Sequence, residues 1–270
     1  MIASKALIVA SLATLCVVAP AQQVTLRFKP PVGKTFKYTM VTKTSQSGGP
    51  MSVGDSSQMM TMTMKILSQS AGKTVMESAI TDAKVNMSAN PQMKGMATQV
   101  ENMLKNFKAT TTLDPYGKGL DTKVAGGNPM MQGIASNIGG GVGSMYSFPK
   151  EAVGVGSTWK VPFDFGKVMA GAVPGMKLSG GKTNVVCKLT GFENSGGKRI
   201  AVISTTVSAT IGMSLGAGGT ATTTTNSKGV LKVDVATGMP VSVNSENTSK
   251  TSMGTMIMNQ TTSTSMKLAG

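Results

Sequence analysis

The segment Met60-Thr61-Met62-Thr63-Met64-Lys65-Ile66 places apolar and polar side chains in strict alternation. Because successive side chains of a strand point to opposite faces, this period of two predicts a half-buried β-strand. The segment Phe36–Lys43 alternates in the same way, and Gly48-Gly49-Pro50 between the two is a turn signal. The pattern therefore predicts two consecutive strands joined by a turn.

Most of the remaining chain continues this β pattern. Thr and Val dominate the later segments, as is typical of strands, and Gly-containing turns separate them. The further strands that we expect lie at 73–87 (one strand or two), 109–124 (a pair around an Asp-Pro turn), 157–163, 183–191, 199–213, 219–226, 230–235, 240–250 and 255–268.

Two segments change to helical spacing. After Asn90-Pro91, an N-cap residue followed by proline at the first helical position, the apolar residues fall within an arc of about 100°. This pattern predicts an amphipathic helix over 91–108. The same device at Asn128-Pro129 predicts a second, shorter helix over 129–138.

Two motifs suggest that the halves of the chain are related. Val32–Lys37 and Val155–Lys160 share the pattern V-G-x-T-[F/W]-K, and an Asp-containing turn follows later in each half. An internal duplication into halves 22–127 and 145–270 is one interpretation. Chance similarity among Thr-rich strands is the other.

Together these patterns predict an α+β fold that is mostly β. We expect a curved, half-barrel-like antiparallel sheet with one or two amphipathic helices packed on it, and residues 22–270 as a single β-rich domain. Phe36 and Trp159 are expected in the core, because aromatic residues make up only 4% of the sequence and their area is scarce.

The first residues have the pattern of a signal peptide. Lys5 precedes an apolar run that is short for a membrane span, and Ala19-Pro20-Ala21 offers a small-x-small cleavage pattern. We expect residues 1–21 to be removed and the mature chain, which has no transmembrane segment in this interpretation, to be exported to the periplasm or beyond. A retained anchor and a lipidated Cys16 are the alternatives. Cys187 would then be a lone thiol, and its strand-like surroundings favour a buried structural role.

The composition argues against catalysis. The 270 residues include no histidine and only 11 acidic residues. Catalytic pairs that need His are therefore excluded, and carboxylates for a metal site are few. We expect no catalytic residue, no cofactor and no carboxylate or histidine metal site.

The charge balance points to anionic partners. The formal net charge is +15, which suits solubility and loose association with an anionic envelope surface. The lysines are scattered, however, and Arg occurs only at 27 and 199. With few aromatic residues to stack bases, nucleic-acid binding is not expected.

Methionine is unusually frequent, with 23 residues. Its flexible thioether can fill an irregular core, line an adaptable apolar surface or bind Cu(I), and these three interpretations stay open. We expect the first predicted helix to cover the concave face of the sheet. The candidate ligand-binding residues on that helix and the facing strand are Met60, Met62, Met64, Met93, Met96, Val100, Met103 and Phe107.

Two stretches resemble a known family. Leu26–Tyr38 and Phe148–Trp159 look like parts of a family of exported bacterial β-rich proteins catalogued as a domain of unknown function. This resemblance implies a β-rich fold and no known activity. The expected layout is also similar to the half-barrel carriers that move lipoproteins or lipids across the periplasm, although a shared architecture does not imply a shared function.

The sequence thus predicts an exported, non-catalytic binding or carrier protein for an apolar or lipid-like ligand in the cell envelope. The alternative is a structural or cell-surface interaction protein without a small ligand, which the Thr- and Ser-rich strands suggest.

Overall fold

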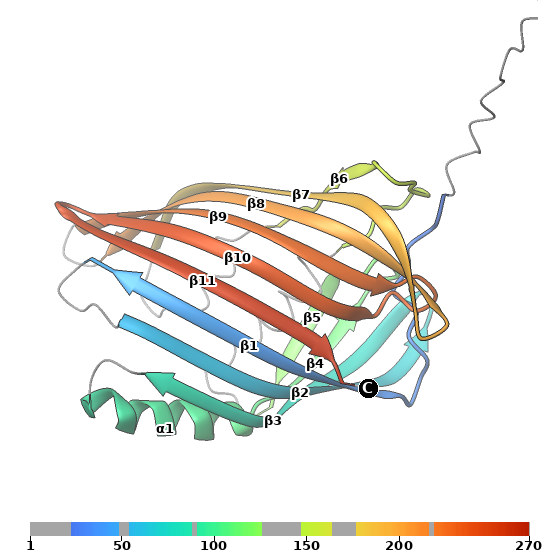
Figure 1. The fold of residues 1–270 in the computed structure, drawn as a ribbon, viewed down its shortest axis with the longest axis horizontal. Coiled ribbons are helices and arrows are strands. Elements are labelled where there is room, and N and C mark those ends of the chain that lie inside the picture. Colours follow the sequence, from blue (N-terminus) through green and yellow to red (C-terminus); the bar gives the residue numbers. More distant parts are fainter. Residues whose placement is uncertain are drawn as a thin grey trace, which may run out of the picture.

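One large antiparallel sheet dominates the molecule (Figure 1). The computed structural model describes residues 23–48, 54–87, 91–125, 147–163, 177–215 and 219–269. Its elements are β1 (Thr35–Ser47), β2 (Gly54–Ser70), β3 (Lys73–Met87), α1 (Pro91–Lys105), β4 (Lys108–Leu113), β5 (Gly119–Val124), β6 (Thr158–Lys160), β7 (Lys177–Ser195), β8 (Lys198–Leu215), β9 (Gly219–Asp234), β10 (Pro240–Met253) and β11 (Met256–Leu268).

The sheet consists of two series of neighbouring strands that meet in its middle. Its eleven strands lie in the order β5-β4-β3-β2-β1-β11-β10-β9-β8-β7-β6. Strands that are neighbours in the sheet are also neighbours in the chain, except at the seam where β1 pairs with β11. The consecutive strands β5 and β6 form the two edges of the sheet. Figure 1 shows the sheet curling away from this seam, with β4, β5 and β6 behind the central strands. The expected fold, mostly β with one antiparallel sheet, is therefore confirmed.

Alternating side chains divide the sheet into two faces. We call the side that buries Tyr38, Met64 and Leu231 the core face, and the opposite side the outer face. The strand register carries this division across the sheet, since Tyr38 lies opposite Met62 on β2 and opposite Leu268 on β11. The period of two in the sequence thus becomes one continuous apolar surface.

Two irregular segments cross the core face at one end of the sheet, which we call the closed end (right in Figure 1). Residues 23–31 bond to the β4–β5 turn, where Phe28 N donates to Pro115 O at 2.8 Å, and to the β9–β10 turn. Residues 147–161 bond to the β4–β5 turn and to β7. The main apolar cluster of this end includes Leu26, Tyr38, Met62, Met64, Ile66, Leu189, Ile203 and Leu231.

Helix α1 packs on β3. Its residues Val100, Met103 and Leu104 join a second apolar cluster whose other members include Met40, Met60, Ile80, Ala83, Phe107 and Ala109. The carboxylate of Glu101 accepts a hydrogen bond of 2.7 Å from Val85 N on β3. The helix expected over 91–108 is confirmed, although β4 already begins at Lys108. It is the single helix of the described chain, and the second expected helix, 129–138, lies outside the described residues.

Strand β9 corrects a sequence prediction. We expected separate strands at 219–226 and 230–235, but one strand runs from Gly219 to Asp234. Pairing with β8 on one side and β10 on the other holds the intervening residues extended. Gly229 lies where a Cβ atom would come within 2.9 Å of Asn244 O. This glycine therefore permits a close approach of strands and does not make a turn. The segment 73–87, expected as one strand or two, is the single strand β3.

The two V-G-x-T-[F/W]-K motifs build the same local structure. Gly33 N donates to Ile66 O and Gly156 N donates to Leu189 O, each at 2.8 Å. Both glycines have positive φ, at 80° and 93°. Phe36 and Trp159, three residues after each glycine, both pack on the main apolar cluster. The motif therefore starts a strand in the same way in each half, and the duplication itself stays a prediction.

Candidate functional site

The core face changes character away from the closed end. At the other end of the long strands, which we call the open end (left in Figure 1), its positions on β1, β2, β10 and β11 carry mostly Thr, Ser, Asn and Gln, whereas Ile211, Met213 and Ala221 of β8 and β9 form a small apolar cluster there. The polar side chains are half-buried, and they include Thr42, Thr44, Gln46, Gln58, Ser245, Asn247, Thr262 and Thr264. Over the described lengths of β1–β3 and β7–β11, one core-facing position carries a charged residue, Arg199 at the closed end, whose guanidinium stacks on Phe192 at 3.9 Å from the ring centroid. The core-facing positions of these strands at the open end carry no charge.

Threonine hydroxyl groups at the open end bond to one another across strands. The pairs are Thr42–Thr264 at 3.4 Å, Thr44–Thr262 at 3.3 Å and Thr223–Thr251 at 2.9 Å between Oγ1 atoms. Because each of these hydroxyls has a partner, its hydrogen-bonding capacity is partly used within the sheet, while its methyl group remains free for apolar contact. The open end is therefore less polar than its composition suggests.

One polar atom of this surface has no partner. Asn247 lies on the core face of β10, between Thr262 of β11 and Ser227 of β9. Its Oδ1 atom is buried and accepts no hydrogen bond from the described residues. A buried acceptor without a donor is costly, so this position favours a bound group that carries a hydroxyl or an amide N–H.

The closed end has the features of a core. Tyr38 Oη donates to Pro240 O at 3.1 Å, and burial raises the pKa of Tyr38 above its ordinary range. Cys187 is 1% exposed, and burial raises the pKa of its thiol from 9.0 to about 12. Trp159 is half-buried, and its Nε1 donates to Ser147 O at 3.0 Å. The expectation that Cys187 is a buried thiol is confirmed.

The structure separates the residues that the sequence proposed as one ligand-binding surface. Met60 packs in the cluster below α1, together with Phe107 and the half-buried Val100 and Met103. Met62 and Met64, 3% and 1% exposed, lie instead in the main cluster of the closed end. The side chains of Met93 and Met96 lie outside the described residues. The ligand-binding role of this set stays a prediction, but α1 does not lie over Met62 and Met64 as we expected.

The methionines of β2 and β11, whose thioethers could bind Cu(I), lie in different surroundings. Those of β2 are buried among apolar side chains, and Met60 Sδ accepts a hydrogen bond of 3.2 Å from Gln58 Nε2. On β11, Met256 is 40% exposed, whereas Met258 is half-buried and accepts a hydrogen bond from Gln46 Nε2. No sulfur cluster therefore stands out in these strands. Among the described residues, no three Asp, Glu or Cys side chains converge as metal ligands would.

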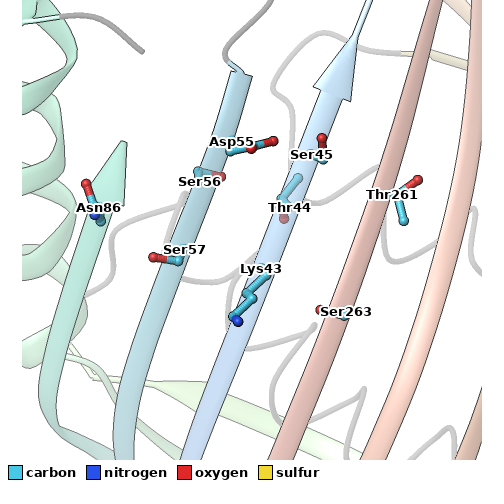
Figure 2. A pocket seen from close by; sticks show the side chains of 9 residues that line it. All are labelled: Lys43, Thr44, Ser45, Asp55, Ser56, Ser57, Asn86, Thr261 and Ser263. Carbon is cyan, nitrogen blue, oxygen red and sulfur yellow. The ribbon is translucent and has the colours of Figure 1, made fainter. Parts of the chain in front are cut away.

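The outer face carries two shallow hollows, which sequence reasoning missed. One, of about 400 Å³, spans β3, β2, β1 and β11, and Figure 2 shows Lys43 in its middle, with Ser57 and Asn86 to one side and Ser263 to the other. The second, of about 620 Å³, spans β1, β11, β10 and β9. Both hollows include Lys43 and Ser263, so they are adjacent. Strand alternation places Lys43 on this face. This period of two was the feature of the sequence that could have located the hollows.

Within the described chain, no helix combines the length and the apolar character that crossing a membrane requires.

No protein-family model matches the sequence, and the search of curated proteins found no match. Among solved structures, the chain is similar to lipovitellin, in a study of its lipid–protein interactions, with a TM-score of 0.47 and 11% identity. This match covers 90% of the present chain and 25% of lipovitellin, so the chain spans about a quarter of that protein. The resemblance of the two motifs to a family of unknown function stays a prediction.

Two further matches are bacterial. The β domain of a Bordetella autotransporter gives a TM-score of 0.19 with 9% identity, over 88% of this chain and 99% of that one. An outer-membrane channel from Pseudomonas putida F1 gives 0.20 with 8% identity, over 90% and 98%. All three TM-scores are below 0.5, so we draw no functional conclusion from them.

Proposed function

We propose that this chain is an exported, non-catalytic carrier or binding protein for an apolar or lipid-like ligand of the cell envelope. The ligand lies on the core face at the open end. The observation that carries this proposal is the segregation of charge, since the core-facing positions at the open end of the long described strands carry none. Burying a charge against an apolar chain is costly, so a face without charge suits such a ligand.

The chemistry of the open end also restricts the polar part of the ligand. A carboxylate or phosphate would need a cation beside it, and the core face of the long described strands offers none at the open end, since Arg199 lies at the closed end. The unpartnered Oδ1 of Asn247 needs a donor instead. The preferred ligand is therefore an uncharged amphiphile with hydroxyl or amide groups, and the paired threonines contact its apolar chain through their methyl groups.

A binding assay tests this proposal. The folded protein should take up a fluorescent monoacylglycerol probe with saturable affinity, and a fluorescent fatty acid more weakly. Thr44→Lys places a charge on the core face and should weaken uptake at least about tenfold, on the order of 1.4 kcal/mol. Ser45→Lys places the same charge at the next residue, which lies on the outer face, and should leave probe uptake unchanged. Both variants should keep the native circular dichroism spectrum.

The choice of variant matters, because Met62 lies in the closed-end core. A lysine at Met62 would unfold the protein and would not report on binding. If the folded protein takes up neither probe, and native mass spectrometry of protein from its own envelope finds no retained lipid, the carrier proposal fails.

The alternative function is a structural or cell-surface interaction protein. The observation that favours it is the outer face, where exposed Thr, Ser and Asn side chains cover much of β8–β11. Absence of any apolar ligand, together with specific adhesion of the folded chain to envelope material, would replace the carrier proposal with this one.

Export is part of the proposal and has its own test. The proposal requires cleavage after Ala21, which N-terminal sequencing of the mature protein would detect. An intact Met1 or a lipid on Cys16 would contradict it.

A further inference from the structure

The positive charge of the central strands lies on one face. On β1, β11, β10 and β9, all six lysines occupy outer-face positions. Five are exposed, and one, Lys232, is half-buried and paired with Glu193 at 2.7 Å. The six are Lys37, Lys43, Lys228, Lys232, Lys250 and Lys267. Strand alternation therefore turns a scattered set of lysines into a one-sided array.

Few acidic residues oppose these lysines. The four strands contain Glu246, which lies on the same face, and Asp234 at the end of β9. Asp234 is buried, and its Oδ1 accepts a hydrogen bond of 2.9 Å from Ala236 N, so its role is to cap the β9–β10 turn. The array therefore keeps a clear excess of positive charge.

The lysines extend in two directions. Lys43 and Lys228 lie in one row across the sheet, through Ser263 of β11 and Glu246 of β10. Three strand spacings separate them by about 14 Å, and the six positions from Lys37 to Lys43 span about 20 Å along β1. These separations exceed the screening length of about 8–10 Å near physiological salt. Each lysine thus acts almost independently, which suits a partner that presents charge over an area.

The hollows around Lys43 argue against one enclosed anion. Asp55 lines the first hollow and Glu246 lines the second. A phosphate seated deep beside Lys43 would meet one of these carboxylates, whereas a surface that touches the lysine tips would not. Hydroxyl groups such as Ser263 and Thr261 can donate hydrogen bonds to the same surface.

We propose that the outer face of β1, β11, β10 and β9 docks on an anionic membrane surface through its lysine array. A layer of anionic headgroups presents charge in two directions, as the lysines do, whereas a linear acidic polymer could reach only one row of them at a time. This docking site is separate from the ligand face and does not depend on the proposed carrier function.

Vesicle binding tests the proposal. The folded chain should sediment with phosphatidylcholine vesicles that contain phosphatidylglycerol, and not with phosphatidylcholine alone. Binding should weaken as salt rises. The combined variant Lys43→Gln, Lys228→Gln, Lys267→Gln should bind on the order of 100-fold more weakly, since each lysine near such a surface contributes about fivefold. The control Lys118→Gln, Lys123→Gln, Lys150→Gln changes net charge equally, at exposed positions outside the four strands, and should bind nearly as the parent.

Three results would overturn the proposal: no binding to anionic vesicles, equal weakening in both triple variants, or tighter binding to a soluble acidic polysaccharide than to vesicles. The variant Thr44→Lys separates the two proposed surfaces. It should lose probe uptake on the core face while its vesicle binding is kept.

Discussion

The closed and open ends of the core face differ although the same strands build both. On β9, Leu231 is 2% exposed at the closed end, whereas Thr223, on the same face of the same strand, is half-buried at the open end. At the closed end, residues 23–31 and 147–161 cross the face, and branched apolar side chains fill the space beneath them. At the open end most positions carry threonine, serine and amide side chains, and the apolar cluster there is small, with Ile211, Met213 and Ala221 as its buried members.

This difference indicates that the two ends of one sheet have different roles. The closed end supplies the apolar burial that stabilises the fold. The open end is tied by cross-strand hydroxyl pairs, which are individually weak and need no tight packing. Stability and binding can therefore be changed separately, and the following predictions test that separation.

The largest expected difference is between two substitutions on β9. Leu231→Ala should lower the free energy of unfolding by about 2–5 kcal/mol, because it opens a cavity in the main cluster. Thr223→Ala should lower it by about 1 kcal/mol, the net value of one hydrogen bond. Urea unfolding measures both. Equal losses would mean that the open end is packed as tightly as the closed end.

Substitutions of Trp159 test whether the apolar packing of the closed end extends to β6. Trp159→Ala should cost about 3 kcal/mol, at the low end for a large aromatic residue because the ring is half-buried. Trp159→Phe keeps most of the apolar area, loses the bond to Ser147 O, and should cost about 1 kcal/mol. The native emission of this single tryptophan should be blue-shifted, and a red-shifted emission would place the ring outside the core.

Cys187 makes the closed end sensitive to alkali. Its thiolate is disfavoured by burial, so its pKa is about 12 when folded and near 9 when unfolded. Below pH 9 both states are protonated and stability is unaffected. As the pH rises from 9 toward 12 the unfolded state releases its proton first, and stability should fall by up to about 1.4 kcal/mol per pH unit.

The control for this pH dependence is Cys187→Ala. This variant should be less stable near neutral pH, because a buried side chain is shortened. Its stability should then fall less steeply with alkali than that of the parent. If the free energies of unfolding of parent and variant fall equally steeply with pH, the assignment of this pH dependence to Cys187 is contradicted.

The smallest effect is expected from one hydroxyl. Tyr38→Phe removes the buried hydrogen bond to Pro240 O, and should cost about 1 kcal/mol. Tyr116→Phe is a matched control, because the ring of Tyr116 that faces Arg27 is retained. If Tyr38→Phe leaves the free energy of unfolding unchanged, the Pro240 carbonyl finds another donor in the variant.

Local patterns predicted the elements well. The alternation of Met60–Ile66 and the proline-capped stripe after Asn90 correspond to β2 and α1. The break expected before Val230 was wrong, because polar residues at 226–229 look like a loop but lie in the middle of the sheet. Pairing on both sides supplies the hydrogen bonds that such residues would otherwise seek in a turn.

The candidate site was predicted less well. Met60, Met62 and Met64 share one face of β2, as the period of two requires, yet they belong to two clusters. The reason is that a long strand crosses more than one environment, and periodicity does not say what lies above each position. The Thr- and Ser-rich strands suggested a surface without a small ligand, since threonines on the core face resemble those of any exposed strand.

By itself, the sequence determined which residues alternate, where α1 begins, and therefore that lysines and apolar side chains occupy opposite faces. These properties depend on neighbours along the chain and on the geometry of the backbone. Tertiary structure alone decided that β1 pairs with β11, that two segments cross one end of the core face, and that six lysines form one array. Such features join residues far apart in the chain, and no local pattern encodes which distant partner a strand will meet.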